Sequence, residues 1–366
     1  MVVYIICPAR TYTGGPTALF QLCHALRKNS INAIMAFYGK INGNPIHPNY
    51  KKYKCPWVIV DDIKDKKDTA VITPETAINQ LEHFKKVKKI IYWLSVDNFV
   101  LTLYKPKLSK VRFISFLIKN YGFNPKVAYN LLSNNRTFYY NAYLANYVKL
   151  LIDKKVISLP KADIHLAQSI YAENFLKDYR VGTKRIIMLH EPIEEEFIRK
   201  AKNINSTKKT NAVAWNGRKA YPVAFELIKM LKKRGITVFN LENVGKSRMI
   251  EVLSKTKIFL DVGIHPGRDR PPREATLLNN IVIVNNHGGC YYFDDCMVPK
   301  EFKLDCYLDC EIEYDKYAKR IEEYLNNFDF YIKKFHRFKR YILQEPHIFL
   351  NEVHKLSKIL IKWGVS

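Results

Sequence analysis

The chain has 366 residues, a length that predicts about two domains. Hydrophobic residues make up 48% and charged residues 26% of the sequence, which is ordinary for a globular protein, and the sequence offers no apolar run long enough to predict a transmembrane helix. The formal net charge of +26 suits a polyanionic partner such as nucleic acid, anionic lipid or nucleotide phosphates. The Lys-, Asn-, Ile- and Tyr-rich usage of an AT-rich genome explains the same charge equally well.

The first part of the chain alternates strand-like and helix-like segments. A short apolar run at 2–7 predicts a buried strand, and a turn at 13–17 leads into a helical pattern over 18–26. The N-terminal run lacks a basic n-region, which argues against a signal peptide and favours a cytoplasmic protein. Further strands are predicted at 32–38, 57–60, 69–72, 89–94 and 162–169, the last as the final strand of this half. This rhythm predicts an α/β fold with a doubly wound parallel sheet.

Residues 101–160 combine many lysines and arginines with many aromatic residues. Such a segment suits the headgroup region of an anionic membrane. A solvated basic face over an aromatic core explains it equally well.

The second half repeats the strand–helix rhythm. Strands are predicted at 211–215, 237–241, 257–262 and 281–285, and helices at 222–233, 247–256, 272–278, 317–326 and 349–361. We therefore predict a Rossmann-like N-terminal domain at 1–190 and a Rossmann-like C-terminal domain at 191–340. The C-terminal helix at 341–366 is expected to pack back on the first domain.

The segment 265–276, HPGRDRPPREAT, follows a predicted strand and precedes a predicted helix. Ligands of open α/β sheets bind at such positions. Its candidate ligand-binding residues are Gly267, Arg268, Asp269, Arg270, Arg273 and Glu274. Glycine permits close approach of the backbone, guanidinium groups suit phosphate oxygens, and the carboxylates could accept hydrogen bonds from sugar hydroxyls. The alternative is a salt-bridged capping loop.

This segment resembles the nucleotide-sugar site of retaining GT-B glycosyltransferases. Glu274-Ala275 matches the second half of the Glu-x7-Glu motif of that class, whose glutamate binds the nucleotide ribose. Pro266 stands where the first glutamate would fall, so retention and inversion both stay open. The string PGRDRxPREA is also similar to one in glycosyltransferases of bacterial capsule and lipopolysaccharide clusters. The resemblance implies a GT-B architecture, with two Rossmann-like domains facing a cleft and with C-terminal helices.

Three glycine-containing turns fit the same architecture. In the turn Asn216-Gly217-Arg218-Lys219 the resemblance implies that the two cations neutralise the diphosphate leaving group, although an exposed basic turn is the plain alternative. Gly14 and Gly15 occupy the place of the glycine-rich loop of the first domain. Gly288 and Gly289 would allow close approach to the donor, or would simply form a tight turn.

Polar residues at two predicted strand ends of the first domain are candidates for the acceptor side. Asp97 is the candidate general base of an inverting enzyme, and a helix cap is the equal alternative. Ser95 and Glu75 are expected near the acceptor.

The sequence thus predicts a glycosyltransferase that moves a sugar from a UDP- or GDP-sugar donor to a polysaccharide or lipid-linked glycan. No Asp-x-Asp motif is evident, so we expect no metal and no cofactor, and a protein bound peripherally to the cytoplasmic face of the inner membrane. A nucleotide-sugar epimerase of the same fold is one alternative. A basic nucleic-acid-binding protein is another, which the absence of an RNA- or DNA-binding motif makes the weaker one.

Overall fold

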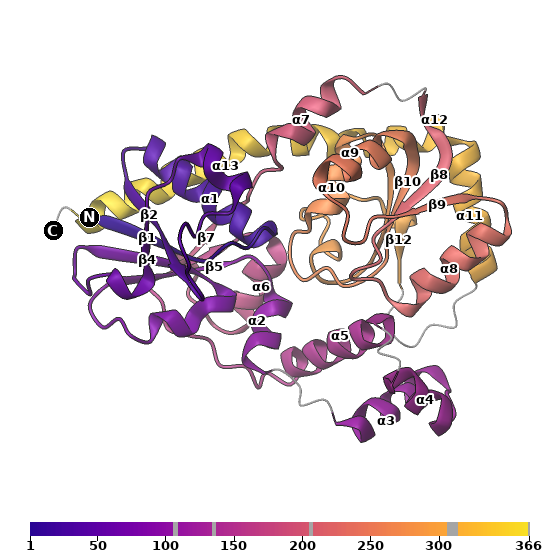
Figure 1. Cartoon of the computed structure of the whole chain (residues 1–366), viewed down its shortest axis with the longest axis horizontal. Helices are drawn as coiled ribbons and strands as arrows, with labels where there is room; N and C mark the ends of the chain where they lie inside the picture. Colours follow the sequence, from indigo (N-terminus) through magenta and orange to yellow (C-terminus); the bar gives the residue numbers. More distant parts are fainter. Residues whose placement is uncertain (105–108, 134–136, 205–207, 306–313, 365–366) are drawn as a thin grey trace. The chain divides into compact units, whose positions relative to one another are not determined.

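The computed structural model describes residues 1–104, 109–133, 137–204, 208–305 and 314–364 (Figure 1). Contacts divide the chain into two compact units. Unit 1 comprises Met1–Phe99, Ser158–Pro192 and Gln344–Ser366, and unit 2 comprises Val100–Ile157 and Ile193–Leu343.

Unit 1 is built on a parallel sheet of seven strands in the order β3-β2-β1-β4-β5-β6-β7. The strands are β1 (Val2–Pro8), β2 (Asn32–Tyr38), β3 (Trp57–Ile59), β4 (Thr69–Pro74), β5 (Lys88–Trp93), β6 (Ile164–Ala167) and β7 (Ile186–Met188). All six residues of β4 are buried, because a central strand of a parallel sheet is covered on both faces. This explains the continuous apolar runs of the sequence.

Helices cover this sheet, as Figure 1 shows for α1 and α13. The helices that begin in unit 1 are α1 (Gly14–Lys28), α2 (Val96–Leu103) and α6 (Ile170–Asp178), and α13 (His336–Gly364) enters from unit 2. Within α13, Phe349, Val353, Leu356 and Leu360 join the buried apolar cluster of unit 1. Their spacing of three or four residues places them on one helical face.

Unit 2 contains a second parallel sheet, in the order β12-β11-β10-β8-β9. Its strands are β8 (Thr210–Trp215), β9 (Thr237–Asn240), β10 (Thr256–Asp261), β11 (Ile281–Asn285) and β12 (Lys303–Leu304). Its helices are α3 (Lys110–Tyr121), α4 (Pro125–Ser133), α5 (Thr137–Asp153), α7 (Glu195–Lys202), α8 (Pro222–Lys233), α9 (Lys246–Lys255), α10 (Arg270–Leu277), α11 (Tyr314–Asn326) and α12 (Phe328–Tyr331). Both sheets are therefore doubly wound, as the alternating pattern predicts.

Short 3-10 helices occupy several connections. They are η1 (Pro48–Tyr53), η2 (Val60–Asp62), η3 (Glu75–Leu81), η4 (Thr183–Arg185), η6 (Gly288–Cys290), η7 (Lys300–Phe302) and η8 (Ile332–Phe335).

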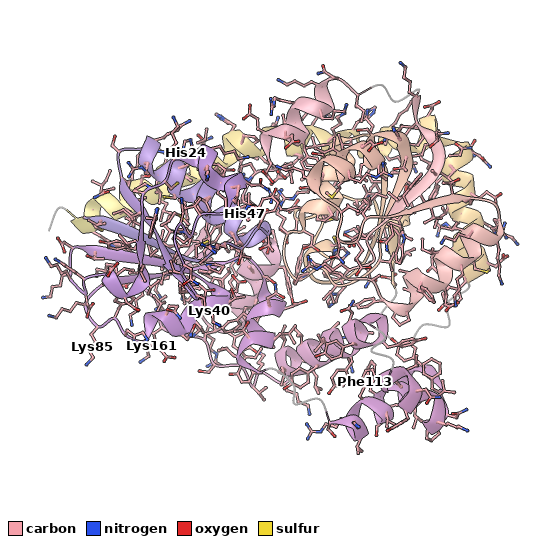
Figure 2. The ribbon with its side chains drawn as sticks, viewed as in Figure 1. His24, Lys40, His47, Lys85, Phe113 and Lys161 are labelled. Carbon is pink, nitrogen blue, oxygen red and sulfur yellow. The ribbon has the colours of Figure 1, made fainter. Side chains whose placement is uncertain are left out.

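Residues 100–157 belong to unit 2, whereas the sequence analysis placed them in a first domain at 1–190. Phe113, Phe116 and Tyr143 are buried in the same apolar cluster as the sheet of unit 2, and the rings of Phe116 and Tyr143 lie 5.3 Å apart. Figure 2 labels Phe113 among the helices of this segment. In α5, the Asn141 side-chain amide donates to the carbonyl of Ala220 at 3.1 Å. These aromatic residues thus belong to a core, as expected from the interpretation of the segment as a solvated basic face over an aromatic core.

The clearest differences from the sequence prediction concern the strands β7 and β12 and the helix α13. The sequence prediction missed β7, which follows the strand at 162–169, and β12. These strands have only three and two residues, so they show no periodic pattern. Helix α13 begins at His336, thirteen residues before the predicted start, and continues through Pro346. Within the described residues, every helix is too short or too polar to cross a bilayer.

Candidate functional site

The strand order of unit 2 defines a topological switch point at the carboxyl ends of its strands, which we call the crevice of unit 2. From β8 the chain proceeds to β9 on one side, and β10 then pairs with β8 on the other side. The connections that leave β8 and β10 therefore diverge at the carboxyl ends of these strands. In open α/β sheets this is where ligands bind. The predicted segment 216–219 directly follows β8, and the predicted segment 265–276 lies in the connection after β10 and the helix that it enters.

The loop after β10 is locked by close backbone contacts. A Cβ atom on Gly288 would lie 1.9 Å from the carbonyl oxygen of His265, and Gly288 has a φ of +54°. A Cβ on Gly289 would lie 2.0 Å from the carbonyl oxygen of Gly267. The N–H of Gly289 donates to the carbonyl of His265 at 2.9 Å. Both glycines therefore permit close approach to the 265–267 backbone. The sequence left open a close approach to the donor or a tight turn, and the first stays a prediction.

A buried network links the two connections through charged side chains. The Nζ of Lys219 lies 3.1 Å from Oδ1 of Asp269, and Nδ1 of His265 lies 3.0 Å from Oδ2 of Asp269. Burial raises the pKa of Asp261 to about 6. Burial opposes protonation of His265, but its hydrogen bond to Asp269 and the charge of Asp261 outweigh burial and raise its pKa. The network thus fixes Lys219 against the loop.

The same residues have the spacing of a metal site. One ligand atom from each of Asp261, His265 and Asp269 lies within 4.8 Å of the others. Lys219 and His265 both contact the carboxylate of Asp269. These contacts hold the loop whether or not an ion binds.

Two of the predicted phosphate-binding arginines are used inside the protein. Arg273 is 1% exposed, and its guanidinium donates to the carbonyls of Asp269 at 3.2 Å and Arg268 at 3.1 Å. Arg268 is 2% exposed and stacks over the ring of Tyr341 at 5.3 Å. Both residues thus contact the loop and its surroundings in this structure. That they bind phosphate stays a prediction.

Glu274 lies in a second charged cluster, at the start of α10. Burial raises its pKa to about 7, although Arg270 and Arg273 act in the opposite direction. Glu194 adds to the increase. Glu194 pairs with Nζ of Lys246 at 3.0 Å, and Nη2 of Arg270 lies 3.8 Å from it. A half-buried arginine, a lysine and two buried carboxylates thus gather beside the crevice.

Glu194 and Lys246 were not among the predicted site residues. Glu194 stands in a run of three glutamates, just after the predicted domain boundary between residues 190 and 191. Lys246 is the first residue of α9, the helix that follows β9. The position of Lys246 just beyond the end of a parallel strand was the signal that could have identified it.

Unlike the three arginines of the segment 265–276, Arg218 has an exposed side chain. Its backbone N–H donates to the side-chain oxygen of Asn216 at 3.2 Å, which shapes the turn. A Cβ on Gly217 would lie 2.9 Å from a carboxylate oxygen of Glu242, so the turn approaches that side chain closely. The turn therefore presents the Arg218 guanidinium at the carboxyl end of β8.

The candidates of unit 1 are mostly buried. Asp97 is 2% exposed and accepts a hydrogen bond from the hydroxyl of Tyr171 at 2.7 Å. The Ser95 hydroxyl accepts from the N–H of Asn98 at 3.2 Å at the start of α2. These contacts favour a structural role for both residues over general-base catalysis or acceptor binding.

Glu75 lies at the corresponding crevice of unit 1, where β1 and β4 are neighbours and their connections diverge. It is 2% exposed, and burial raises its pKa to about 8 even though its carboxylate accepts the N–H of Leu94 at 2.9 Å. Gly14 and Gly15 begin α1 at the same edge. A Cβ on Gly15 would meet Leu94 at an ordinary 3.7 Å, so within the described residues packing does not require glycine there.

Comparisons with known proteins give the fold. No family model matches the chain, and no curated protein matches it in sequence. The structure of a glycosyltransferase from Rickettsia africae ESF-5 aligns with a TM-score of 0.59 at 13% identity, over 99% of this chain and 98% of that one. Sucrose-phosphate synthase from Thermosynechococcus elongatus gives a TM-score of 0.58 at 10% identity, over 98% and 99%. Anabaena HepE in complex with UDP-glucose gives 0.56 at 10% identity, over 99% of both chains.

These similarities extend over almost the whole chain and both Rossmann-like units. The chain therefore has the GT-B fold, which confirms the fold predicted from the sequence.

Proposed function

We propose that the chain is a glycosyltransferase that binds a nucleotide-sugar donor at the crevice of unit 2. One observation carries this proposal: the carboxyl ends of β8 and β10 bring together an exposed arginine, a half-buried arginine and a buried glutamate. These are Arg218, Arg270 and Glu274. Cations bind the phosphate oxygens of a diphosphate, and a carboxylate accepts hydrogen bonds from ribose hydroxyls.

Each residue has a role that follows from its surroundings. Arg218 contacts the diphosphate and, with Arg270, stabilises the negative charge that develops on it as the sugar leaves. The Lys219 side chain contacts Asp269 and is still 33% exposed, so it can also reach the diphosphate. Glu274 accepts hydrogen bonds from the ribose. The reaction needs no metal ion, because these cations supply the charge.

UDP is the nucleotide we propose first, because the HepE structures contain UDP or UDP-glucose. GDP is the alternative to test beside it. The acceptor we propose is a growing polysaccharide or a lipid-linked glycan of the capsule or lipopolysaccharide kind.

The helices α3 and α4 support a peripheral association with an anionic membrane on the cytoplasmic side. Val111 is 72% exposed, Val127 40% and Ile118 39%, although all three are apolar. Lys110, Arg112, Lys119 and Lys126 stand beside them in the sequence. Apolar side chains among cations suit the interface of an anionic bilayer.

The direct test is turnover of UDP- and GDP-sugars with glycan acceptors, followed by release of the nucleoside diphosphate. We expect release to require an acceptor and to persist in EDTA. Loss of activity in EDTA would contradict the metal-free mechanism. Conversion of the donor to its epimer without any transfer would instead show an epimerase.

A further inference from the structure

A second cationic site lies in unit 1, at the opposite edge of the sheet from Glu75. A cavity of about 510 Å³ opens there, at the amino ends of β5, β6 and β7. It is lined by six cationic side chains and one carboxylate, belonging to Lys85, Lys86, Lys88, Lys89, Lys161, Arg185 and Asp163. Figure 2 labels Lys85 and Lys161 close together at this edge.

The backbone of the cavity is firmly held. Asp65 accepts the N–H groups of Lys85, Lys86 and Val87 at 2.9, 2.7 and 3.1 Å. Asp163 accepts the N–H of Lys89 at 2.8 Å, and its own N–H donates to the carbonyl of Lys89 at 2.8 Å. The two nearby carboxylates thus hold the main chain that carries the lysines, and they remain outnumbered by the six cations.

Few of these cations are paired with a carboxylate. Among the described residues, Lys88 alone of the six lies within ion-pair distance of a carboxylate, 3.8 Å from Asp163, and both side chains of that pair are about 40% exposed. Lys88 also lies over the ring of Trp363 at 5.7 Å. Like charges so close together repel, and a multivalent anion removes that repulsion.

We infer that this cavity binds a compact anion carrying two or more phosphate groups. Its volume lies within the range of small-molecule sites, roughly 300–1,000 Å³, and exceeds what one phosphate fills. Lysine ammonium groups act as flexible point charges, so they select for charge more than for shape. The phosphates can come from a soluble oligophosphate or from lipid headgroups. The site stands apart from the proposed donor site, which lies in unit 2.

The test is titration calorimetry with tripolyphosphate at low salt, in the presence of saturating UDP. Lys85→Glu/Lys161→Glu alters the cavity. Lys28→Glu/Lys51→Glu, two exposed lysines of unit 1 outside it, makes the same change in net charge. We expect the first variant to weaken binding by about tenfold or more and the second by less than about threefold. Circular dichroism verifies that both variants fold.

The source of the phosphate is resolved by sedimentation with phosphatidylcholine vesicles, with and without phosphatidylglycerol. Tripolyphosphate binding without vesicle binding assigns a soluble oligophosphate. Loss of phosphatidylglycerol-dependent sedimentation in the cavity variant alone assigns a lipid headgroup. Equal weakening of both variants, or undiminished binding in the cavity variant, overturns the inference. These readouts do not depend on catalysis, so they stand even if the proposed donor fails to bind.

Discussion

Single arginines at the crevice of unit 2 differ sharply in their surroundings. Arg268 and Arg273 are buried and directed at protein atoms, whereas Arg218 is exposed at the end of β8. The Arg273 guanidinium already donates to two main-chain carbonyls, which leaves it less capacity for a ligand. We therefore propose the ligand-binding role for Arg218 and the half-buried Arg270.

Arg218→Ala is expected to weaken binding of the nucleotide sugar by about tenfold to a hundredfold, since a charge-assisted hydrogen bond contributes about 1.5–3 kcal/mol. Stability should hardly change, because the side chain is exposed. Calorimetric titration and thermal unfolding measure the two effects. Lys232→Ala, at an exposed lysine of α8, is the control. Equal affinity of wild type and Arg218→Ala would remove this residue from the site.

Glu274 gives a pH dependence to donor binding. Because burial raises its pKa to about 7, the carboxyl is protonated below that pH and ionised above it. An ionised carboxylate is the better acceptor for ribose hydroxyls. Affinity for UDP-glucose, which has no phosphate group titrating near pH 7, should therefore increase as pH rises through about 7.

In Glu274→Gln this increase should disappear, because the amide does not titrate. The test is to measure affinities at intervals from pH 6 to pH 8, which covers about one pH unit on either side of the Glu274 pKa. An unchanged pH profile in Glu274→Gln would assign the titration to another group.

At the scale of elements, the connection after β10 depends on the glycines that follow β11. An alanine at 288 would need a positive φ and would place its Cβ 1.9 Å from the carbonyl oxygen of His265. Gly288→Ala should therefore destabilise the protein by about 2–5 kcal/mol. At Gly182 an added Cβ meets nothing within 4 Å and φ is −61°, so Gly182→Ala should cost less than about 1 kcal/mol. Urea unfolding compares them, and similar stabilities would refute the packing described here.

Glu75 makes the stability of unit 1 depend on pH. Its pKa is about 8 in the fold and 4.5 ordinarily, so between these values the folded state holds a proton that the unfolded state has lost. The contribution of Glu75 to the free energy of unfolding is complete below about pH 4.5. As pH rises above that value, this free energy falls by about 1.4 kcal/mol per pH unit, and the contribution is lost as pH passes about 8.

Glu75→Gln should remove that slope and make the protein more stable than wild type above pH 8. Urea unfolding at several pH values measures the difference. The exposed Glu82→Gln serves as the control and should follow wild type. If Glu75→Gln also followed wild type, the buried carboxyl would not titrate as described.

The elements with strong periodic patterns could be predicted from the sequence. Helix α8 lies at its predicted bounds, and β2 and β11 do also. Strands β7 and β12 could not, because three and two residues carry no period. The start of α13 was missed because Pro346 disfavours a helix interior, which tertiary packing outweighs here.

The candidate site was predictable in position but not in detail. The segment 265–274 does lie at the carboxyl end of β10, because strand–loop–helix order determines that. Which arginines face solvent depends on packing against residues far along the chain, such as Tyr341, and no local pattern contains that information. Glu194 and Lys246 meet only in the folded unit, so their pairing could not be anticipated.

At the scale of the whole molecule, the net charge of +26 is distributed unevenly over distinct places. Cations gather in the cavity of unit 1, along α3 and α4, and beside the crevice of unit 2. Each gathering suits a different anion.

We propose that unit 2 binds a nucleoside diphosphate sugar through Arg218. Calorimetric titration in EDTA tests this, with wild type and Arg218→Ala titrated with UDP, GDP, their glucose and mannose conjugates, and the matching monophosphates. We expect wild type to bind at least one diphosphate sugar more tightly than its monophosphate, and Arg218→Ala to lose that preference. Absence of binding to the entire panel, or an unchanged preference in Arg218→Ala, would contradict it.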